Sequence, residues 1–140
     1  MKKNNKDVIK VINFGHPLSL KAKEMIVKKL SKDYEKDIDL QEVIINSTID
    51  VNAPKEVQYS KVIDNTFNLV DLSGRSPVYI LLPGLSLSVA MLISMLAGLT
   101  GTLPKVINLK RDNKLGIFVM DEILDLEHIR QNARSKRYNN

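Results

Sequence analysis

A chain of 140 residues is long enough to bury the core of one domain, and its content of 44% hydrophobic and 26% charged residues is ordinary for a globular protein. It contains no cysteine, which excludes disulfide bonds, thiolate metal sites and cysteine nucleophiles. The two histidines, His16 and His128, are too few for a His-rich metal site, so we expect neither a metal ion nor a cofactor. The net charge of +5 favours anionic partners, although a Lys- and Asn-rich composition explains it equally well.

The start of the chain and one long apolar stretch decide what the sequence predicts about membranes. Residues 1–7 are basic and polar, and Asn13 and His16 interrupt any apolar segment of a signal peptide, so we expect a cytoplasmic protein. Residues 76–104 carry no charge, and a membrane-spanning helix is one explanation of that stretch. The Pro83-Gly84 pair breaks it early, with strand-forming residues before the break and helix-forming residues after it. We therefore expect a buried strand followed by a buried helix, and no membrane partner.

Hydrophobic periodicity and turn residues divide the chain into alternating strands and helices. A first strand ends at Gly15-His16-Pro17, and Ser19 can cap the helix that follows, as Asp125 can cap the last one. The second helix has an apolar face formed by Tyr59, Ile63, Phe67 and Val70. We predict strands at residues 8–14, 40–49, 78–82, 105–110 and 116–120, and helices at residues 19–30, 55–70, 86–99 and 126–134.

The third predicted helix, residues 86–99, is apolar on nearly every side. The residues that can face the sheet are Val89, Leu92, Ile93 and Leu96. The residues that lie largely elsewhere are Leu87, Met91 and Met95. A helix that covers one face of a sheet ordinarily has a polar outer side, so a second surface should cover this one. The simplest such surface is another copy of the chain, and we expect a homodimer formed through this helix.

The order of the elements predicts an α/β fold, with a Rossmann-like, mainly parallel sheet and helices on both faces. We expect one domain over residues 1–140, with its core at about residues 7–134. The turn at residues 111–114 is too short for a crossover, so the last strand should be antiparallel. The carboxyl ends of parallel strands gather at one edge, where open α/β folds bind ligands. The segments expected at that edge are residues 13–16, 46–48, 83–86 and 110–111.

Each candidate residue at this edge also has a purely structural explanation. Gly84 would let the backbone approach an anion, and Ser86 could donate its hydroxyl to a ligand or merely cap the helix. Asn13 and His16 could contact a base or a phosphate, or His16 could simply hold the turn before a proline. The adjacent Lys110 and Arg111 could balance phosphate charge or form a solvated turn.

The sequence lacks the motifs of several common activities. The chain has no G-x-G-x-x-G and no Walker A sequence, so dinucleotide binding of the Rossmann oxidoreductase type and P-loop ATP hydrolysis are unsupported. Neither Ser86 nor Ser88 lies in a G-x-S-x-G elbow. Aromatic residues make up only 5% of the chain and tryptophan is absent, which argues against a stacking platform for single strands. We also expect no binding of DNA or RNA duplexes.

Two stretches together resemble a known family. The first is Val11-Ile12-Asn13-Phe14-Gly15-His16-Pro17-Leu18-Ser19. The second is Leu82-Pro83-Gly84-Leu85-Ser86-Leu87-Ser88-Val89-Ala90, followed by Gly98, Gly101, Pro104 and Val106-Ile107-Asn108-Leu109-Lys110-Arg111. This pattern resembles a small single-domain family encoded in type III CRISPR loci and related to the CRISPR-associated Rossmann-fold (CARF) sensors. The resemblance covers residues 8–130.

The resemblance implies a homodimer that binds a cyclic oligoadenylate second messenger, cyclic tetra-adenylate in particular, across its two-fold axis and damps the antiviral signal. It also implies a site lined by Asn13, Gly15, His16, Pro83, Gly84, Leu85 and Ser86. With the strand-end residues Phe14, Ser47, Lys110 and Arg111, these form the predicted ligand-binding set. Two positions differ from the family pattern: Gly15 stands in place of a serine, and Leu82 in place of a more polar residue.

We predict sequestration of the messenger without turnover, and two alternatives stay open. In a metal-independent ring nuclease, the ribose 2′-OH would attack the adjacent phosphate to give linear products with a 2′,3′-cyclic phosphate. His16 would be the base of that reaction, and Lys110 or Arg111 would stabilise charge. The second alternative is an adaptor without nucleotide affinity, in which the apolar third helix binds a different protein.

Overall fold

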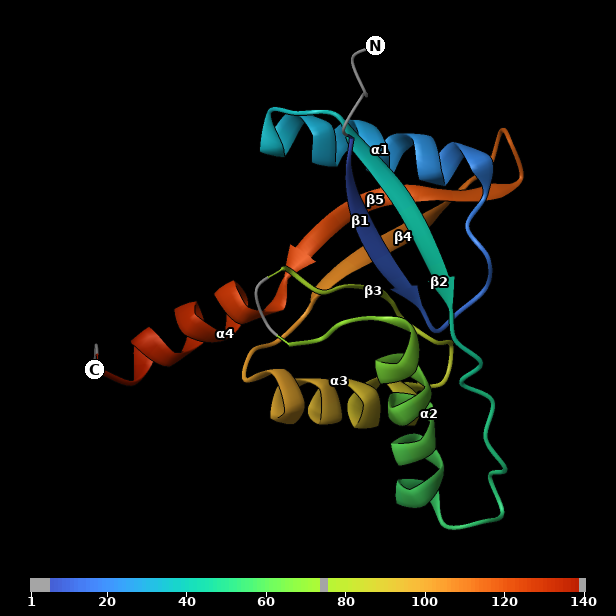
Figure 1. Cartoon of the computed structure of the whole chain (residues 1–140), viewed down its shortest axis with the longest axis vertical. Helices are drawn as coiled ribbons and strands as arrows, with labels where there is room; N and C mark the ends of the chain where they lie inside the picture. The colour runs from blue at the N-terminus through green and yellow to red at the C-terminus, as the bar shows by residue number, and fades with distance from the viewer. Residues whose placement is uncertain (1–5, 74–75, 139–140) are drawn as a thin grey trace.

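Strands and helices alternate along the chain in the computed structural model, which describes residues 6–73 and 76–138 (Figure 1). The strands are β1 (Asp7–Asn13), β2 (Ile38–Ile44), β3 (Tyr79–Leu81), β4 (Lys105–Asp112) and β5 (Ile117–Asp125). The helices are α1 (Leu20–Tyr34), α2 (Lys55–Leu69), α3 (Ser86–Thr100) and α4 (Leu126–Ser135), followed by a short 3-10 helix, Lys136–Tyr138. Most of the basic start of the chain, residues 1–5, lies outside the described residues.

The five strands form one sheet in the order β2-β1-β3-β4-β5. The first four of these are parallel, while β5 pairs antiparallel with β4. The predicted α/β class, mainly parallel sheet and antiparallel last strand are therefore confirmed, and the arrangement is consistent with a Rossmann-like fold. The chain runs outward from β1 to β2 and then crosses over β1 to β3. The strand order thus reverses between β1 and β3, the point at which doubly wound sheets with this order bind ligands.

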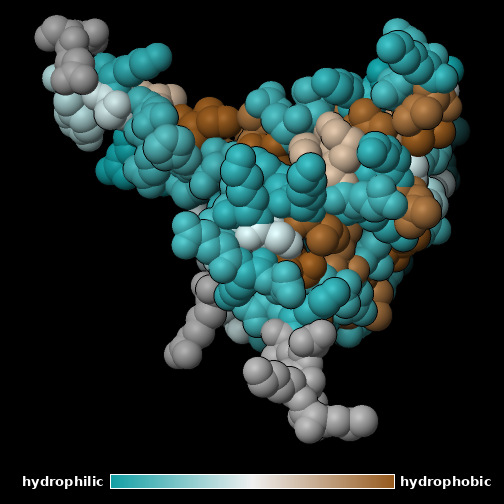
Figure 2. Space-filling view, turned by 90° about the horizontal axis from the view of Figure 1, so that it is seen from above, coloured by the Kyte–Doolittle hydropathy of each residue, from teal (hydrophilic) through white to brown (hydrophobic). Residues whose placement is uncertain are grey.

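Different helices cover the two faces of the sheet (Figure 1). Helix α1 packs with residues such as Val11 and Ile107 on one face, while α2 and α3 pack with Ile12 and Ile80 on the other. Adjacent residues such as Val11 and Ile12 thus point to opposite sides of one strand and are both buried. Seen from above, the surface over α1 is mostly hydrophilic, as its exposed lysines require (Figure 2).

Several elements differ in extent from their prediction: α1 ends at Tyr34 and not at residue 30, and β5 ends at Asp125 and not at residue 120. β2 ends at Ile44 and not at residue 49, because the last backbone bond to β1 is the one from the Ile45 amide to the carbonyl oxygen of Asn13. Helix α2 buries Val62 and Thr66 in addition to Tyr59 and Ile63 of the predicted face. Its Phe67, expected on the buried face, is instead 40% exposed.

Helix α3 packs against the core with more of its circumference than the sequence predicts. Ser88, Leu92 and Leu96 are buried at intervals of four residues. Met91 and Met95, expected on the outer side, pack against the core cluster of the α2–α3 face. Helix α2 contacts α3 and so covers part of its circumference (Figure 1). The uncharged outer surface of α3 is therefore smaller than expected.

The caps predicted for the first and last helices are present. Ser19 Oγ accepts a hydrogen bond from the Ala22 amide at 3.1 Å, and Asp125 Oδ1 accepts one from the His128 amide at 3.1 Å. Helix α4, which follows the second cap, extends away from the sheet and buries none of its residues (Figure 1). In the described part of the chain, no helix combines the length and the apolar character that a bilayer crossing requires.

Candidate functional site

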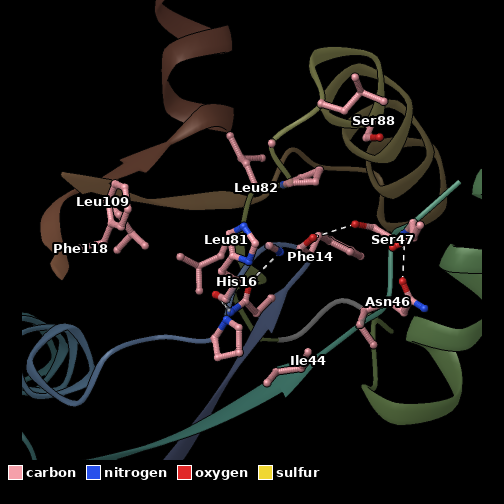
Figure 3. Close-up of a pocket in the computed structure, with 18 of the residues that line it drawn as sticks. Phe14, His16, Ile44, Asn46, Ser47, Leu81, Leu82, Ser88, Leu109 and Phe118 are labelled. Atoms are coloured by element: carbon pink, nitrogen blue, oxygen red, sulfur yellow. Dashed lines mark hydrogen bonds between the residues drawn. The ribbon is translucent and has the colours of Figure 1, made fainter. Parts of the chain in front are cut away.

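A cavity of about 1000 Å³ lies at the carboxyl ends of the strands (Figure 3). Residues 13–17 after β1, 44–49 after β2 and 81–85 after β3 supply most of its lining. Leu109, Ile117 and Phe118 of the β4–β5 pair complete one side. The volume is at the upper end of the range of roughly 300–1,000 Å³ that is usual for small-ligand sites.

The structure brings most of the predicted ligand-binding residues together around this cavity. The predicted residues in its lining are Asn13, Phe14, Gly15, His16, Ser47, Pro83, Gly84 and Leu85. The predicted residues outside the described lining are Ser86, Lys110 and Arg111. The predicted convergence of strand ends is thus seen for three of the four segments, and the fourth contributes only its neighbour Leu109.

The side chain of Asn13 holds the loop after β1 in place. It is fully buried, and its Nδ2 donates to the carbonyl oxygen of His16 at 2.8 Å and to Glu42 Oε2 at 2.7 Å. Its Oδ1 accepts from the Gly15 amide at 2.8 Å. Both amide hydrogens are therefore used within the chain, and Asn13 has no N–H left to donate to a base or phosphate. Its role in the site is to position the loop.

Glu42 of β2 completes this network, and sequence reasoning missed it. Its Oε2 also accepts from the Leu18 amide at 2.9 Å, and its Oε1 lies 3.4 Å from Lys23 Nζ. The carboxylate, 8% exposed, thus joins β1, the loop after it and α1. The only sequence signal was an acidic residue inside a strand otherwise rich in apolar residues.

Gly15 lies where no side chain fits. A Cβ at this position would be 2.8 Å from the carbonyl oxygen of Leu82, closer than real Cβ contacts allow. The loop is drawn to β3 by the Phe14 amide, which donates to the Leu81 carbonyl oxygen at 3.0 Å, and to the segment after β2 by Ser47 Oγ, which donates to the Phe14 carbonyl oxygen at 2.7 Å. The close approach explains why this position is a glycine.

His16 presents its imidazole to the cavity. The residue is exposed, and no hydrogen bond to its ring occurs among the described residues. It is also the only titratable side chain in the described lining. In Figure 3 it lies between the side formed by Leu109 and Phe118 and the side formed by Asn46 and Ser47. Of the predicted contacts, His16 is the one best placed to meet a ligand.

The start of α3 borders the cavity without a side-chain cap. Leu85 is the N-cap residue and Ser86 is the first helical residue, so the predicted cap by Ser86 is wrong. Ser88, which also lines the cavity, is buried and shares a 2.7 Å hydrogen bond with the hydroxyl of Tyr59. The first backbone N–H groups of α3 are thus unclaimed by a cap, and such groups attract anions.

Lys110 and Arg111 belong to the β4–β5 pair, which continues past the cavity. Lys110 Nζ lies 3.6 Å from Asp121 Oδ1, an exposed ion pair. Because β4 extends to Asp112, Arg111 is a strand residue like Lys110 and does not belong to the turn predicted at residues 111–114. The described lining of the cavity accordingly contains no Lys, Arg, Asp or Glu side chain.

A second, smaller cavity of about 380 Å³ lies at the opposite edge of the sheet. There the hydroxyls of Tyr34 and Tyr79 share a 2.7 Å hydrogen bond. Burial, followed by this bond, raises the pKa of Tyr79 above its ordinary value, so the phenol stays protonated. The lining includes both acidic and basic residues and shows no charge preference.

Comparisons of the chain with protein-family models, with curated proteins and with solved structures found no match. The family resemblance therefore rests on the two sequence stretches alone, and the function is argued from the cavity.

Proposed function

We propose that the protein binds a cyclic oligoadenylate, cyclic tetra-adenylate in particular, and sequesters it in the cytoplasm as a homodimer, which damps type III CRISPR antiviral signalling. One observation carries the proposal. The two stretches that resemble the family, residues 11–19 and 82–90, are distant in sequence but supply neighbouring walls of one cavity at the switch point between β1 and β3.

The chemistry of the cavity suits a phosphodiester ligand. Its polar groups include backbone N–H groups at the start of α3, the side chains of Asn46 and Thr48, and the imidazole of His16. The described lining has no carboxylate to repel phosphate, and the net charge of +5 attracts an anion over longer distances. A ring of four equal nucleotides has rotational symmetry, so a two-fold dimer, formed through the outer side of α3, would present each loop to it twice.

Sequestration is favoured over cleavage by the scarcity of acid–base groups. A ring nuclease needs a base for the 2′-OH and a donor for the leaving oxygen. His16 could serve as one of them, but the described lining offers no second titratable side chain. Lys110, a proposed charge stabiliser, is paired with Asp121 outside the lining.

The first test is a calorimetric titration of the purified protein with cyclic tetra-adenylate, followed by chromatography of the ligand after prolonged incubation. We expect one ligand bound per two chains and recovery of the intact ring. A His16→Ala variant should bind about ten- to a hundredfold more weakly, the usual effect of losing a hydrogen bond to a charged group. His128→Ala is the matched control, because His128 is exposed on α4 and lies outside the cavity.

Each other result has a distinct meaning. Linear products with a 2′,3′-cyclic phosphate would show that the protein is a ring nuclease and does not merely sequester the ring. If His16→Ala binds the ring with unchanged affinity but no longer forms these products, His16 is the base. No binding by the unmodified chain would overturn both nucleotide functions and leave the adaptor.

A further inference from the structure

An exposed aromatic ring forms one wall of the cavity. Of the two phenylalanines in the lining, Phe14 is 3% exposed and belongs to the core, whereas Phe118 is 56% exposed. Phe118 lies at the start of β5 beside Leu109, across the cavity from Ser47 in Figure 3. A large apolar side chain left open to solvent in a concave site is a candidate ligand contact.

A bulge in β5 determines which way Phe118 points. The register between β4 and β5 shifts after Asn108, which leaves Asp121 as an extra residue in β5. Met120 and Ile123 are three positions apart, yet both pack in the core on the α1 face because of this extra residue. Phe118 is two positions before Met120, so it points to that same face. In a regular strand it would point to the other face, away from the amino end of α1.

The backbone of Phe118 is fixed from two directions. Ser19, the N-cap of α1, donates from Oγ to the Phe118 carbonyl oxygen at 2.8 Å. On its other side Phe118 pairs with Arg111 of β4. The ring is thus carried by a strand pair tied to a helix cap, and little conformational freedom of the backbone is lost when a ligand binds against it.

We infer that Phe118 is a stacking platform for an adenine base of the bound ligand, an inference that rests on the proposed function. A nucleotide has a flat base and a charged sugar–phosphate part. The cavity is divided in the same way: the ring of Phe118 and Leu109 form one side, while the polar His16 and Asn46 lie elsewhere in the lining. Bases stack on aromatic side chains through their π-faces, and this contact needs no charged side chain in the lining.

We expect the affinity for cyclic tetra-adenylate to depend on an aromatic ring at residue 118. Phe118→Ala should weaken the binding of cyclic tetra-adenylate about 5- to 150-fold, the usual effect of removing one stacked base contact. Phe118→Tyr keeps the ring and should bind within about threefold of the unmodified chain. Phe67→Ala is the matched control, because Phe67 is 40% exposed on α2 and lies outside the cavity lining. It should leave the affinity unchanged.

A fluorescence experiment locates the base directly. The chain has no tryptophan, so Phe118→Trp places a single tryptophan at the cavity wall, and excitation at about 295 nm avoids the four tyrosines. Saturable quenching of its emission by cyclic tetra-adenylate, absent from Phe67→Trp, is the expected result. Sedimentation of Phe118→Ala without ligand should give the same mass as the unmodified chain.

The outcomes separate the two claims. If the unmodified chain binds the ring but Phe118→Ala binds it equally well and Phe118→Trp is not quenched, the stacking platform is wrong and the proposed function stands. If Phe118→Ala changes the mass in sedimentation, the ring belongs to an interface between copies and the inference is overturned. If the unmodified chain does not bind, the proposed function falls and the inference with it.

Discussion

Replacing Gly15 by alanine is expected to lower the free energy of unfolding by about 1–3 kcal/mol, the usual cost of forcing extra atoms into a well-packed site. The added Cβ would lie 2.8 Å from the Leu82 carbonyl oxygen. That oxygen belongs to the backbone, so the overlap is relieved only if the loop after β1 moves away from the end of β3. Such movement would strain the bond from the Phe14 amide to the Leu81 carbonyl oxygen. Urea unfolding followed by circular dichroism measures the loss.

Gly84→Ala is the control for this effect. A Cβ at Gly84 would meet no described atom within 4 Å, so its unfolding free energy should stay within about 0.5 kcal/mol of that of the unmodified chain. Gly84 lines the same cavity, so this variant tests ligand approach without disturbing the fold. Gly15→Ser, which adds the same Cβ, should be at least as destabilising as Gly15→Ala. Equal stability of Gly15→Ala and Gly84→Ala would contradict the close approach.

The fold was predictable because its causes are local. Buried strands such as β3 are runs of apolar residues, and the helices between the strands show helical spacing of their apolar residues. Parallel topology then brings the ends of β1, β2 and β3 to one edge. For that reason His16, Ser47 and Gly84 could be placed around one cavity before any contact was known.

The details of the site depended on long-range contacts. Ser86 was expected as a cap, but α3 begins one residue earlier than that role requires. Asn13 was expected to contact a ligand, but its amide donates to the carbonyl oxygen of His16 and to Glu42, a partner 29 positions away. Phe118 reaches the cavity through a bulge, and no pattern in the sequence marks where a strand gains an extra residue. A low aromatic content overall therefore did not rule out one ring at the cavity wall.

Glu42→Leu is expected to be the other strongly destabilising change. It removes the acceptor of the Leu18 amide at 2.9 Å and of Asn13 Nδ2 at 2.7 Å, and leucine offers these buried donors no substitute. Leaving donors unsatisfied costs about 1–3 kcal/mol each. The unfolding free energy should fall by that amount or more. Hydrogen exchange at the Leu18 amide should become faster, and binding of cyclic tetra-adenylate should weaken because the loop carries His16.

Glu42→Gln separates the hydrogen bonds from the charge. The glutamine carbonyl oxygen can accept both bonds, and only the attraction to Lys23 Nζ at 3.4 Å is lost. Because Lys23 is partly exposed, that loss should be at most about 1 kcal/mol, and exchange at the Leu18 amide should stay slow. Glu24→Leu is the matched control, since Glu24 is exposed on α1 and has no hydrogen bond among the described residues. If Glu42→Gln is as damaging as Glu42→Leu, the charge and not the acceptor holds the loop. If Glu42→Leu behaves like Glu24→Leu, Glu42 does not position the loop at all.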